Sequence, residues 1–257
     1  MPDAETPDTL ESERKALIDE VKKKNNENIV ADKMAKTFPL RRKEIVGDRP
    51  LVSTLKERWP GLFGESQIKA EFMRITTKPL SATFFRKFDN ISHRLISICR
   101  SKGGALGKKL QEIMQPLEET GDINKRREVI LTALCHYLGE DSSQLISEYL
   151  DTTLPEEILE REREKAMKIY VVKKEGGDVS DPPADIGIIL EGVDVVSNIR
   201  SVADALILIF GLVYAVDLQY PPKLKYLFEV IQKLIMGLEG SGKLSPKVQS
   251  LKLKLMV

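Results

Sequence analysis

The sequence has few of the residues on which metal and redox sites are usually built. Its 257 residues include two cysteines, two histidines and one tryptophan. Cys135 and His136 are adjacent and so point to different faces of a helix. His93 and Cys99 are six residues apart, and no pair has the spacing of metal ligands. We therefore expect no metal, no cofactor, no disulfide framework and two buried thiols.

A long apolar run is also missing. The longest apolar stretch, Val202 to Val216, is about fifteen residues, contains Asp204, and falls short of the roughly 20 residues that a bilayer span needs. Residues 1–13 are acidic and polar, unlike a secretory signal or a transit peptide. We expect an intracellular protein, cytoplasmic or nuclear, with no membrane partner.

Charge of neither sign dominates. The 40 lysines and arginines nearly balance the 39 acids, which leaves a formal charge of +1. No overall field therefore identifies the chain as a binder of nucleic acid. The distribution is uneven, because residues 61–127 are rich in cations and residues 128–200 are rich in acids. A protein with such an uneven distribution of charge can attract an oppositely charged partner.

Helical periodicity dominates most of the chain. Between Ser81 and Arg100, the apolar residues Phe84, Phe88 and Leu95 recur at helical spacing. Strand patterns occur only at 169–172 and 186–190, with a short third strand expected at 192–196. The sequence predicts a mainly α protein, in which a multi-helix bundle is followed by a small two- to three-stranded β element packed by helices.

Composition changes near the middle of the chain. Residues 152–166 are dominated by Glu and Arg, which indicates a solvated helical connector. We expect a helical domain at 1–151, with 1–10 disordered, and a small sheet with three helices at 167–257. The two parts are either separate or packed as one unit.

Two glycine-rich segments resemble phosphate loops. Gly237 to Leu244 fits the pattern G-x-x-x-x-G-K, but Leu244 replaces the Ser or Thr that would hold magnesium, and the preceding residues have helical spacing. A helix stop is the better interpretation. The second segment lies between two helices and is a plain turn or an anion site. The residues of that possible anion site are Lys102, Gly103, Gly104, Lys108 and Lys109.

Basic residues interleaved with aromatic ones suggest a second kind of site. Phe38 and Trp59 are available for stacking, although acids lie among the cations and favour a solvated helix surface. The possible nucleic-acid contacts are Lys33, Lys36, Arg41, Arg42 and Lys43.

The sequence contains few candidate catalytic residues. Glu191 ends a predicted strand and is a lone carboxylate, and nothing in the sequence places a nucleophile beside either histidine. We expect no catalytic residue.

Several short sequence segments together resemble a known family. The chain is similar to the C-terminal region of the sterile alpha motif domain-containing protein 3-like proteins, a vertebrate family expanded in fish. The resemblance spans about Leu17 to Met256 and implies no activity or catalytic residue. Longer members resemble adaptors with an N-terminal interaction domain, and this chain looks like a short member or a fragment. The segments that carry the resemblance are residues 33–38 with 41–42, 58–63, 71–76, 187–192, and 210–215 followed by 220–221.

The sequence supports three functional hypotheses. The first is a non-catalytic, intracellular protein-interaction or scaffold domain that binds another protein or itself. The alternative is a nucleic-acid-associated protein that binds through basic helices in residues 22–127. An uncharacterised enzyme is the third.

Overall fold

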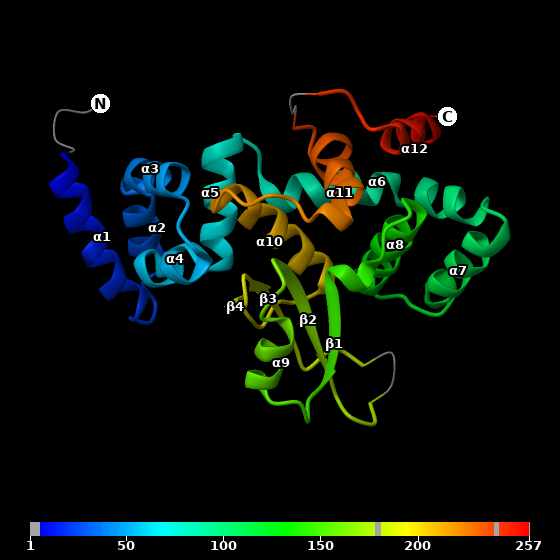
Figure 1. Ribbon diagram of the computed structural model, residues 1–257, viewed down its shortest axis with the longest axis horizontal. Helices are drawn as coiled ribbons and strands as arrows, with labels where there is room; N and C mark the ends of the chain where they lie inside the picture. Colours follow the sequence, from blue (N-terminus) through cyan, green and yellow to red (C-terminus); the bar gives the residue numbers. More distant parts are fainter. Residues whose placement is uncertain (1–5, 178–180, 239–241, 257) are drawn as a thin grey trace. The chain divides into compact units, whose positions relative to one another are not determined.

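The computed structural model of the chain describes residues 6–177, 181–238 and 242–256. Most of these residues are helical, and a small sheet of four strands completes the fold (Figure 1). The prediction of a mainly α protein with a small helix-packed β element is confirmed.

The chain divides into two compact units. Unit 1 comprises residues 1–77 and 211–219, and unit 2 comprises residues 78–210 and 220–257. The predicted connector at 152–166 lies inside unit 2.

The described residues of unit 1 form helices joined by short connections, without a strand. Thr6 caps the first helix, since its hydroxyl accepts a hydrogen bond from the Thr9 N–H at 3.3 Å. Residues 7–10, which we expected to be disordered, form the first turn of this helix, and residues 1–5 lie outside the described range. The elements are α1 (Pro7–Val21), α2 (Glu27–Lys36), α3 (Phe38–Asp48), α4 (Val52–Arg58), the 3₁₀ turn η1 (Pro60–Phe63) and α5 (Glu65–Thr76).

Trp59 is the centre of the unit 1 core. Its side chain is completely buried, and its indole N–H donates to a Glu44 carboxylate oxygen at 2.9 Å. Three guanidinium groups lie within 6 Å of its ring, each paired with an acid, and the ion pairs are Arg14–Glu11, Arg41–Glu71 and Arg58–Glu44. The hydrogen bond from Arg14 is the main reason that the pKa of Glu11 is lowered to about 2.

Unit 2 holds most of the remaining helices. The Asp122 carboxylate caps one of them by accepting hydrogen bonds from the backbone of the next turn at 3.0 and 3.3 Å. The last residues of α10 belong to unit 1. The elements are α6 (Leu80–Arg100), α7 (Gly104–Met114), η2 (Gln115–Glu118), α8 (Ile123–Tyr137), η3 (Ser142–Gln144), α9 (Pro155–Glu162), α10 (Val202–Ala215), η4 (Pro222–Leu224), α11 (Lys225–Glu229), the π-helical turn η5 (Val230–Ile235) and α12 (Pro246–Met256).

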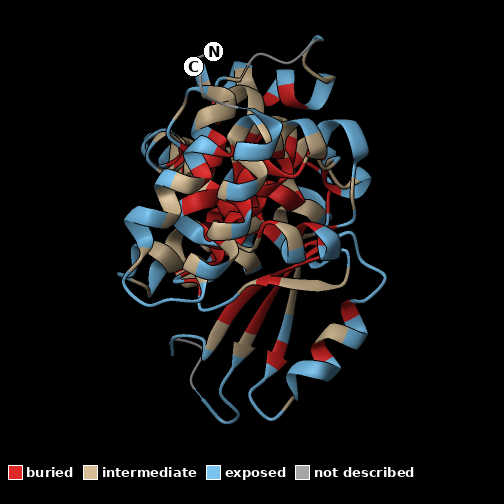
Figure 2. Ribbon diagram, turned by 90° about the vertical axis from the view of Figure 1, so that its left-hand side faces the viewer, coloured by how far each residue is buried: buried red, intermediate tan, exposed pale blue. Residues whose placement is uncertain are grey.

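The sheet lies in unit 2 and has the order β1-β2-β3-β4. β1 runs parallel to β2, whereas β2–β3 and β3–β4 are antiparallel. Figure 2 shows buried residues along the strands and exposed residues in the loops at their ends. The bounds are β1 (Ile146–Leu150), β2 (Met167–Lys173), β3 (Asp185–Leu190) and β4 (Val193–Val196).

β1 is a correction to the sequence analysis. The spacing of Leu145, Ile146, Tyr149 and Leu150 indicated the end of a helix, and the predicted sheet had two or three strands. Asp141 instead caps the short turn η3, and the residues after it pair with β2. A five-residue segment is too short for periodicity to distinguish a helix from a strand.

α9 covers one face of the sheet. Ile158 of this helix is buried against Tyr149, Tyr170 and Ile189, and Glu162 accepts a hydrogen bond from the Tyr149 hydroxyl at 2.6 Å. The segment is therefore part of the unit 2 core, because its apolar side packs on the strands that flank it.

Gly187 allows the sheet to accept a large aromatic ring. Tyr170 lies opposite Gly187 in the β2–β3 pair, and a Cβ at position 187 would lie 2.2 Å from the Tyr170 ring. The Tyr170 hydroxyl donates to an Asp185 carboxylate oxygen at 3.1 Å. Only glycine provides this space.

Across the ranges 6–177, 181–238 and 242–256, no helix combines the length and apolar character that crossing a bilayer requires.

Candidate functional site

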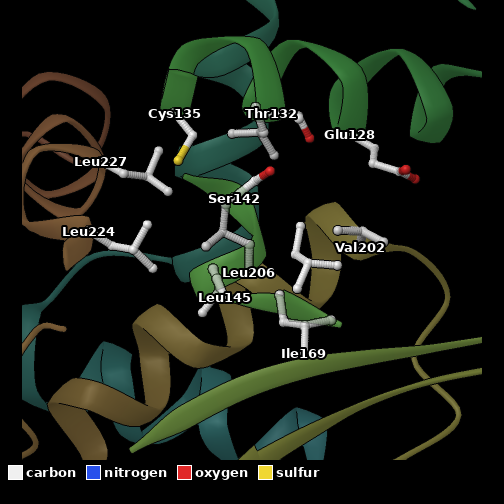
Figure 3. Close-up of a pocket in the computed structure, with 12 residues that line it drawn as sticks. Glu128, Thr132, Cys135, Ser142, Leu145, Ile169, Val202, Leu206, Leu224 and Leu227 are labelled. Carbon is white, nitrogen blue, oxygen red and sulfur yellow. The ribbon is translucent and has the colours of Figure 1, made fainter. Parts of the chain in front are cut away.

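Unit 2 contains a narrow apolar pocket. Its cavity volume is about 20 Å³, room for little more than a water molecule, and it lies between α8, α10, the start of α11 and the first two strands (Figure 3). Leucine and isoleucine side chains make up most of its wall, with a thiol and two hydroxyl groups among them. The lining residues are Glu128, Leu131, Thr132, Cys135, Ser142, Leu145, Ile146, Ile169, Val202, Leu206, Leu224 and Leu227.

The thiol in the pocket, that of Cys135, is a poor nucleophile at neutral pH. Burial, together with the nearby acids Glu140 and Asp141, raises the pKa of Cys135 to about 12. A thiol with such a pKa is protonated at neutral pH, and the thiolate is the nucleophilic form. Cys99, the other cysteine, is also buried, and its pKa is raised to about 11.

Sequence analysis found no nucleophile beside a histidine, but the structure places one there. The Ser142 hydroxyl lies 3.3 Å from Nε2 of His136, and burial lowers the pKa of that histidine. Asp141 does not complete a triad, because its carboxylate accepts a hydrogen bond from the Ser143 N–H at 3.0 Å as the cap of η3. The Ser142–His136 contact joins η3 to α8.

The residues of the predicted anion site lie at the start of α7 and just before it. Gly103 is the N-cap of α7, and Gly104 follows it with a φ of +66°, a conformation that favours glycine. Lys108 and Lys109 are exposed on the first turns of α7. Lys102 turns toward α8 instead, and its ammonium lies 4.9 Å from the centre of the Tyr137 ring.

Further lysines converge on the same region. Lys254 of α12 donates to the Tyr137 hydroxyl at 3.2 Å, and its ammonium lies 5.7 Å from that ring. Lys225 and Lys247 each place an ammonium 4.8 Å from the Tyr226 ring. We call this set the lysine–tyrosine surface, and its residues are Lys102, Tyr137, Lys225, Tyr226, Lys247 and Lys254.

α12 makes this surface continuous. Lys247 and Lys254 are two helical turns apart, so they lie on one face of the helix. Lys247 also donates to the Leu138 carbonyl at 2.9 Å, next to Tyr137. α12 therefore places one ammonium group beside each of the two tyrosines.

The four lysines of this surface have no carboxylate within 4 Å in the described part of the chain. Glu140 is the buried acid nearby, and both of its oxygens accept backbone N–H groups, from Tyr226 and Leu227, at 2.8 Å each. Burial raises the pKa of Glu140 despite these bonds. Lys225 and Lys247 act on Glu140 by lowering its pKa, but none of the four lysines forms an ion pair within 4 Å in the described chain.

The predicted nucleic-acid contacts behave differently. Lys33 pairs with Glu13 at 2.8 Å, and Lys36 pairs with Asp32 at 2.8 Å. Arg42 donates to the Tyr214 carbonyl at 3.1 Å and lies 3.7 Å from Asp217. Lys43 is exposed. Most of these cations thus have a partner within unit 1.

Arg41 corrects the predicted basic surface. Its side chain is completely buried, and its guanidinium makes two hydrogen bonds, at 2.8 and 2.6 Å, to the equally buried Glu71. Trp59, which we considered for base stacking, is also inaccessible. Both residues belong to the core because the chain folds α5 against α3.

In the described part of the chain, neither the Walker-like segment nor Glu191 forms a candidate site. Residues 239–241 of the Walker-like segment lie outside the described range, and η5 precedes the motif where a phosphate loop would follow a strand. Glu191 lies in the turn between β3 and β4 with a φ of +48°. Within residues 6–177, 181–238 and 242–256, no three His, Cys, Asp or Glu side chains converge as metal ligands.

Sequence reasoning missed most of the lysine–tyrosine surface. Tyr137, Tyr226 and three of its lysines come from segments far apart in the chain, and Lys102 alone was identified. The seven-residue spacing of Lys247 and Lys254 is the one local signal that indicates a shared face.

Comparison with known proteins gives one finding. Residues 10–64, which span α1 to η1 in unit 1, match the family model described as Sterile alpha motif domain-containing protein 3, helical domain. No curated protein and no solved structure matches the chain. Over residues 10–64, the chain is therefore similar to the helical domain of the sterile alpha motif domain-containing protein 3-like family.

Proposed function

We propose that the protein is a non-catalytic interaction domain and that unit 2 binds an acidic segment of a partner protein through the lysine–tyrosine surface. The observation that carries this proposal is the row of four lysines without an ion-pair partner in the described chain. A partner with carboxylates at matching spacing gains attraction without first breaking an existing pair.

The geometry favours an acidic peptide over a nucleic acid. Proteins that bind single strands stack bases on exposed aromatic faces and use arginine extensively. Here each tyrosine ring already has two ammonium groups against it, and every cation of the surface is a lysine. Carboxylates can reach these ammonium groups without displacing them from the rings.

The pocket supports a non-catalytic function. Its thiol is protonated at neutral pH, and no carboxylate in the described chain holds His136 beside Ser142.

The test is a fluorescence anisotropy titration of a labelled Asp- and Glu-rich peptide. Two variants, K102Q/K254Q and K225Q/K247Q, each remove one tyrosine's pair of charges. Glutamine keeps an N–H donor, so the hydrogen bonds to Tyr137 and Leu138 can persist. If each exposed charge pair contributes about 0.5 kcal/mol, either variant weakens binding about fivefold.

The control is K87Q/K174Q, which changes the charge of unit 2 equally at two exposed lysines of α6 and the β2–β3 loop. Its affinity for the peptide should match that of the parent protein. Equal loss in the control and the test variants would refute a localised site. Tighter binding of a DNA oligonucleotide at the same salt, weakened by the same variants, would replace the proposal with nucleic-acid binding.

A further inference from the structure

The strand β1 lies at one edge of the sheet, and its outer side has unused backbone groups. The Leu145 carbonyl accepts from the Ile169 N–H at 2.7 Å, and the Asp151 N–H donates to the Lys173 carbonyl at 2.8 Å. Odd-numbered residues of this segment therefore direct their backbone toward β2. By the alternation of a strand, Ile146 and its even-numbered neighbours direct theirs away.

Five of these outward groups are available. In the described part of the chain, no hydrogen bond involves the N–H or carbonyl of Ile146 or Glu148, or the N–H of Leu150. The Leu150 carbonyl accepts from the Thr153 N–H at 2.9 Å and closes the row. An edge of this kind is a template for another strand.

The side chains along this edge have a defined pattern. Ile146 lines the apolar pocket, Glu148 is exposed over more than half of its side chain, and Leu150 is 45% exposed. Lys173 of β2 holds the Glu148 carboxylate at 2.7 Å. The edge therefore presents an apolar, an acidic and an apolar position on one face of the sheet.

A second copy of the chain is a poor occupant. The two-fold antiparallel register that pairs all five residues of β1 would place Glu148 directly opposite Glu148 of the copy. Like charges in directly opposed positions destabilise a strand pair. Lys173 holds only Oε2 of the Glu148 carboxylate, so an incoming strand with a basic residue at this position can pair with Oε1 instead.

We propose that β1 binds an extended peptide of a partner protein as an antiparallel fifth strand, with a lysine or arginine of the peptide opposite Glu148. The residues two before and two after this cation are apolar and lie opposite Leu150 and Ile146. Because opposed side chains lie about 5 Å apart, the residue opposite Ile146 lies beside the pocket that Ile146 lines. This surface uses none of the residues of the lysine–tyrosine surface.

The probe is a nine-residue peptide with the core Val-Thr-Lys-Thr-Val, titrated into ¹⁵N-labelled protein. The amides of Ile146, Glu148 and Leu150 shift on binding, and their hydrogen exchange slows because the peptide covers them. N-methylation of the Lys amide or of the second Val amide, which donate to the Glu148 and Ile146 carbonyls, abolishes binding, whereas N-methylation of the two Thr amides leaves it unchanged. The reverse dependence, or no shift at these amides at millimolar peptide, overturns the proposal.

One change in the peptide and two substitutions at Glu148 distinguish the contribution of the charge pair from that of the backbone hydrogen bonds. Replacing the peptide lysine by glutamate weakens binding about fivefold or more, and Glu148→Gln removes most of that difference. Glu148→Pro deletes an N–H that faces away from β2, so the sheet is kept and the peptide is lost. Thermal melts verify that both variants fold, and the peptide N-methylation series decides the question if the proline variant does not.

Two controls identify other occupants. K102Q/K254Q binds this peptide as the parent does, so failure of the acidic-partner proposal and failure of this one are distinguishable. Sedimentation of the free protein should show no association through β1. A dimer that Glu148→Pro dissociates would overturn the proposal in favour of a second copy.

Discussion

Glu71→Gln should destabilise unit 1 more than any exposed substitution on the same helix. The Glu71 and Arg41 side chains both have zero exposure, and two hydrogen bonds at 2.8 and 2.6 Å join them. Arginine keeps its charge inside a protein, so the variant leaves a buried cation without its anion. Breaking a buried pair in this way costs about 3–5 kcal/mol.

Urea unfolding followed by circular dichroism measures this loss, with the midpoint and slope fitted separately. Lys69→Ala is the matched control, because it breaks the exposed Lys69–Glu65 pair on the same helix and should cost about 0.5 kcal/mol or less.

A double variant tests whether the unpaired charge of Arg41 causes the loss of stability in Glu71→Gln. Arg41→Met with Glu71→Leu replaces the buried pair by apolar side chains, and such replacements are often neutral or stabilising. Part of the loss remains, because Glu71 also holds the half-buried Arg74 at 2.8 Å. We expect it to recover at least half of the stability that Glu71→Gln loses. A loss below about 1 kcal/mol for Glu71→Gln, or no recovery in the double variant, would refute the account of this core.

Three further predictions follow from the structure. At pH 8 iodoacetamide should leave both Cys99 and Cys135 unmodified in the folded protein and label both in 8 M urea; rapid labelling of the folded protein would contradict the burial that raises both pKa values. Gly187→Ala should destabilise unit 2 by about 1–3 kcal/mol in chemical unfolding, because the new methyl group meets the Tyr170 ring; an unchanged midpoint would mean that the ring moves freely. The pKa of Glu11 is lowered to about 2 in the fold, so its ionised form stabilises the protein above its unfolded value of about 4.5, and this contribution is lost as the pH falls through 2. Glu11→Gln should therefore be less stable than the parent at pH 7 and equal to it near pH 2, and a constant difference in unfolding midpoint between these pH values would contradict the linkage.

The sequence predicted the elements whose signals are local. The apolar stripe of α6 and the Asp122 cap of α8 need only neighbouring residues to be recognised, and both are present in the structure. The second and third strands were found because β-branched runs between turn residues have few other interpretations. β1 was missed because its identity depends on pairing with β2, about twenty residues away.

The candidate sites were harder to predict because they depend on long-range contacts. A lysine in the sequence gives no sign of whether an acid will lie beside it after folding. Arg41 and Lys102 looked alike in the sequence, yet one is neutralised in a core and the other remains unpaired against Tyr137. The Ser142–His136 contact was missed because a turn brings together residues without a recognisable motif.

The most direct test of the proposed function is zero-length carbodiimide crosslinking of an acidic peptide to the protein, followed by mass spectrometry. This chemistry joins a carboxylate to an ammonium group that it contacts. We predict that crosslinks concentrate at Lys102, Lys225, Lys247 and Lys254. Crosslinks spread equally over exposed lysines elsewhere, such as Lys87 and Lys174, would contradict the existence of a binding surface there.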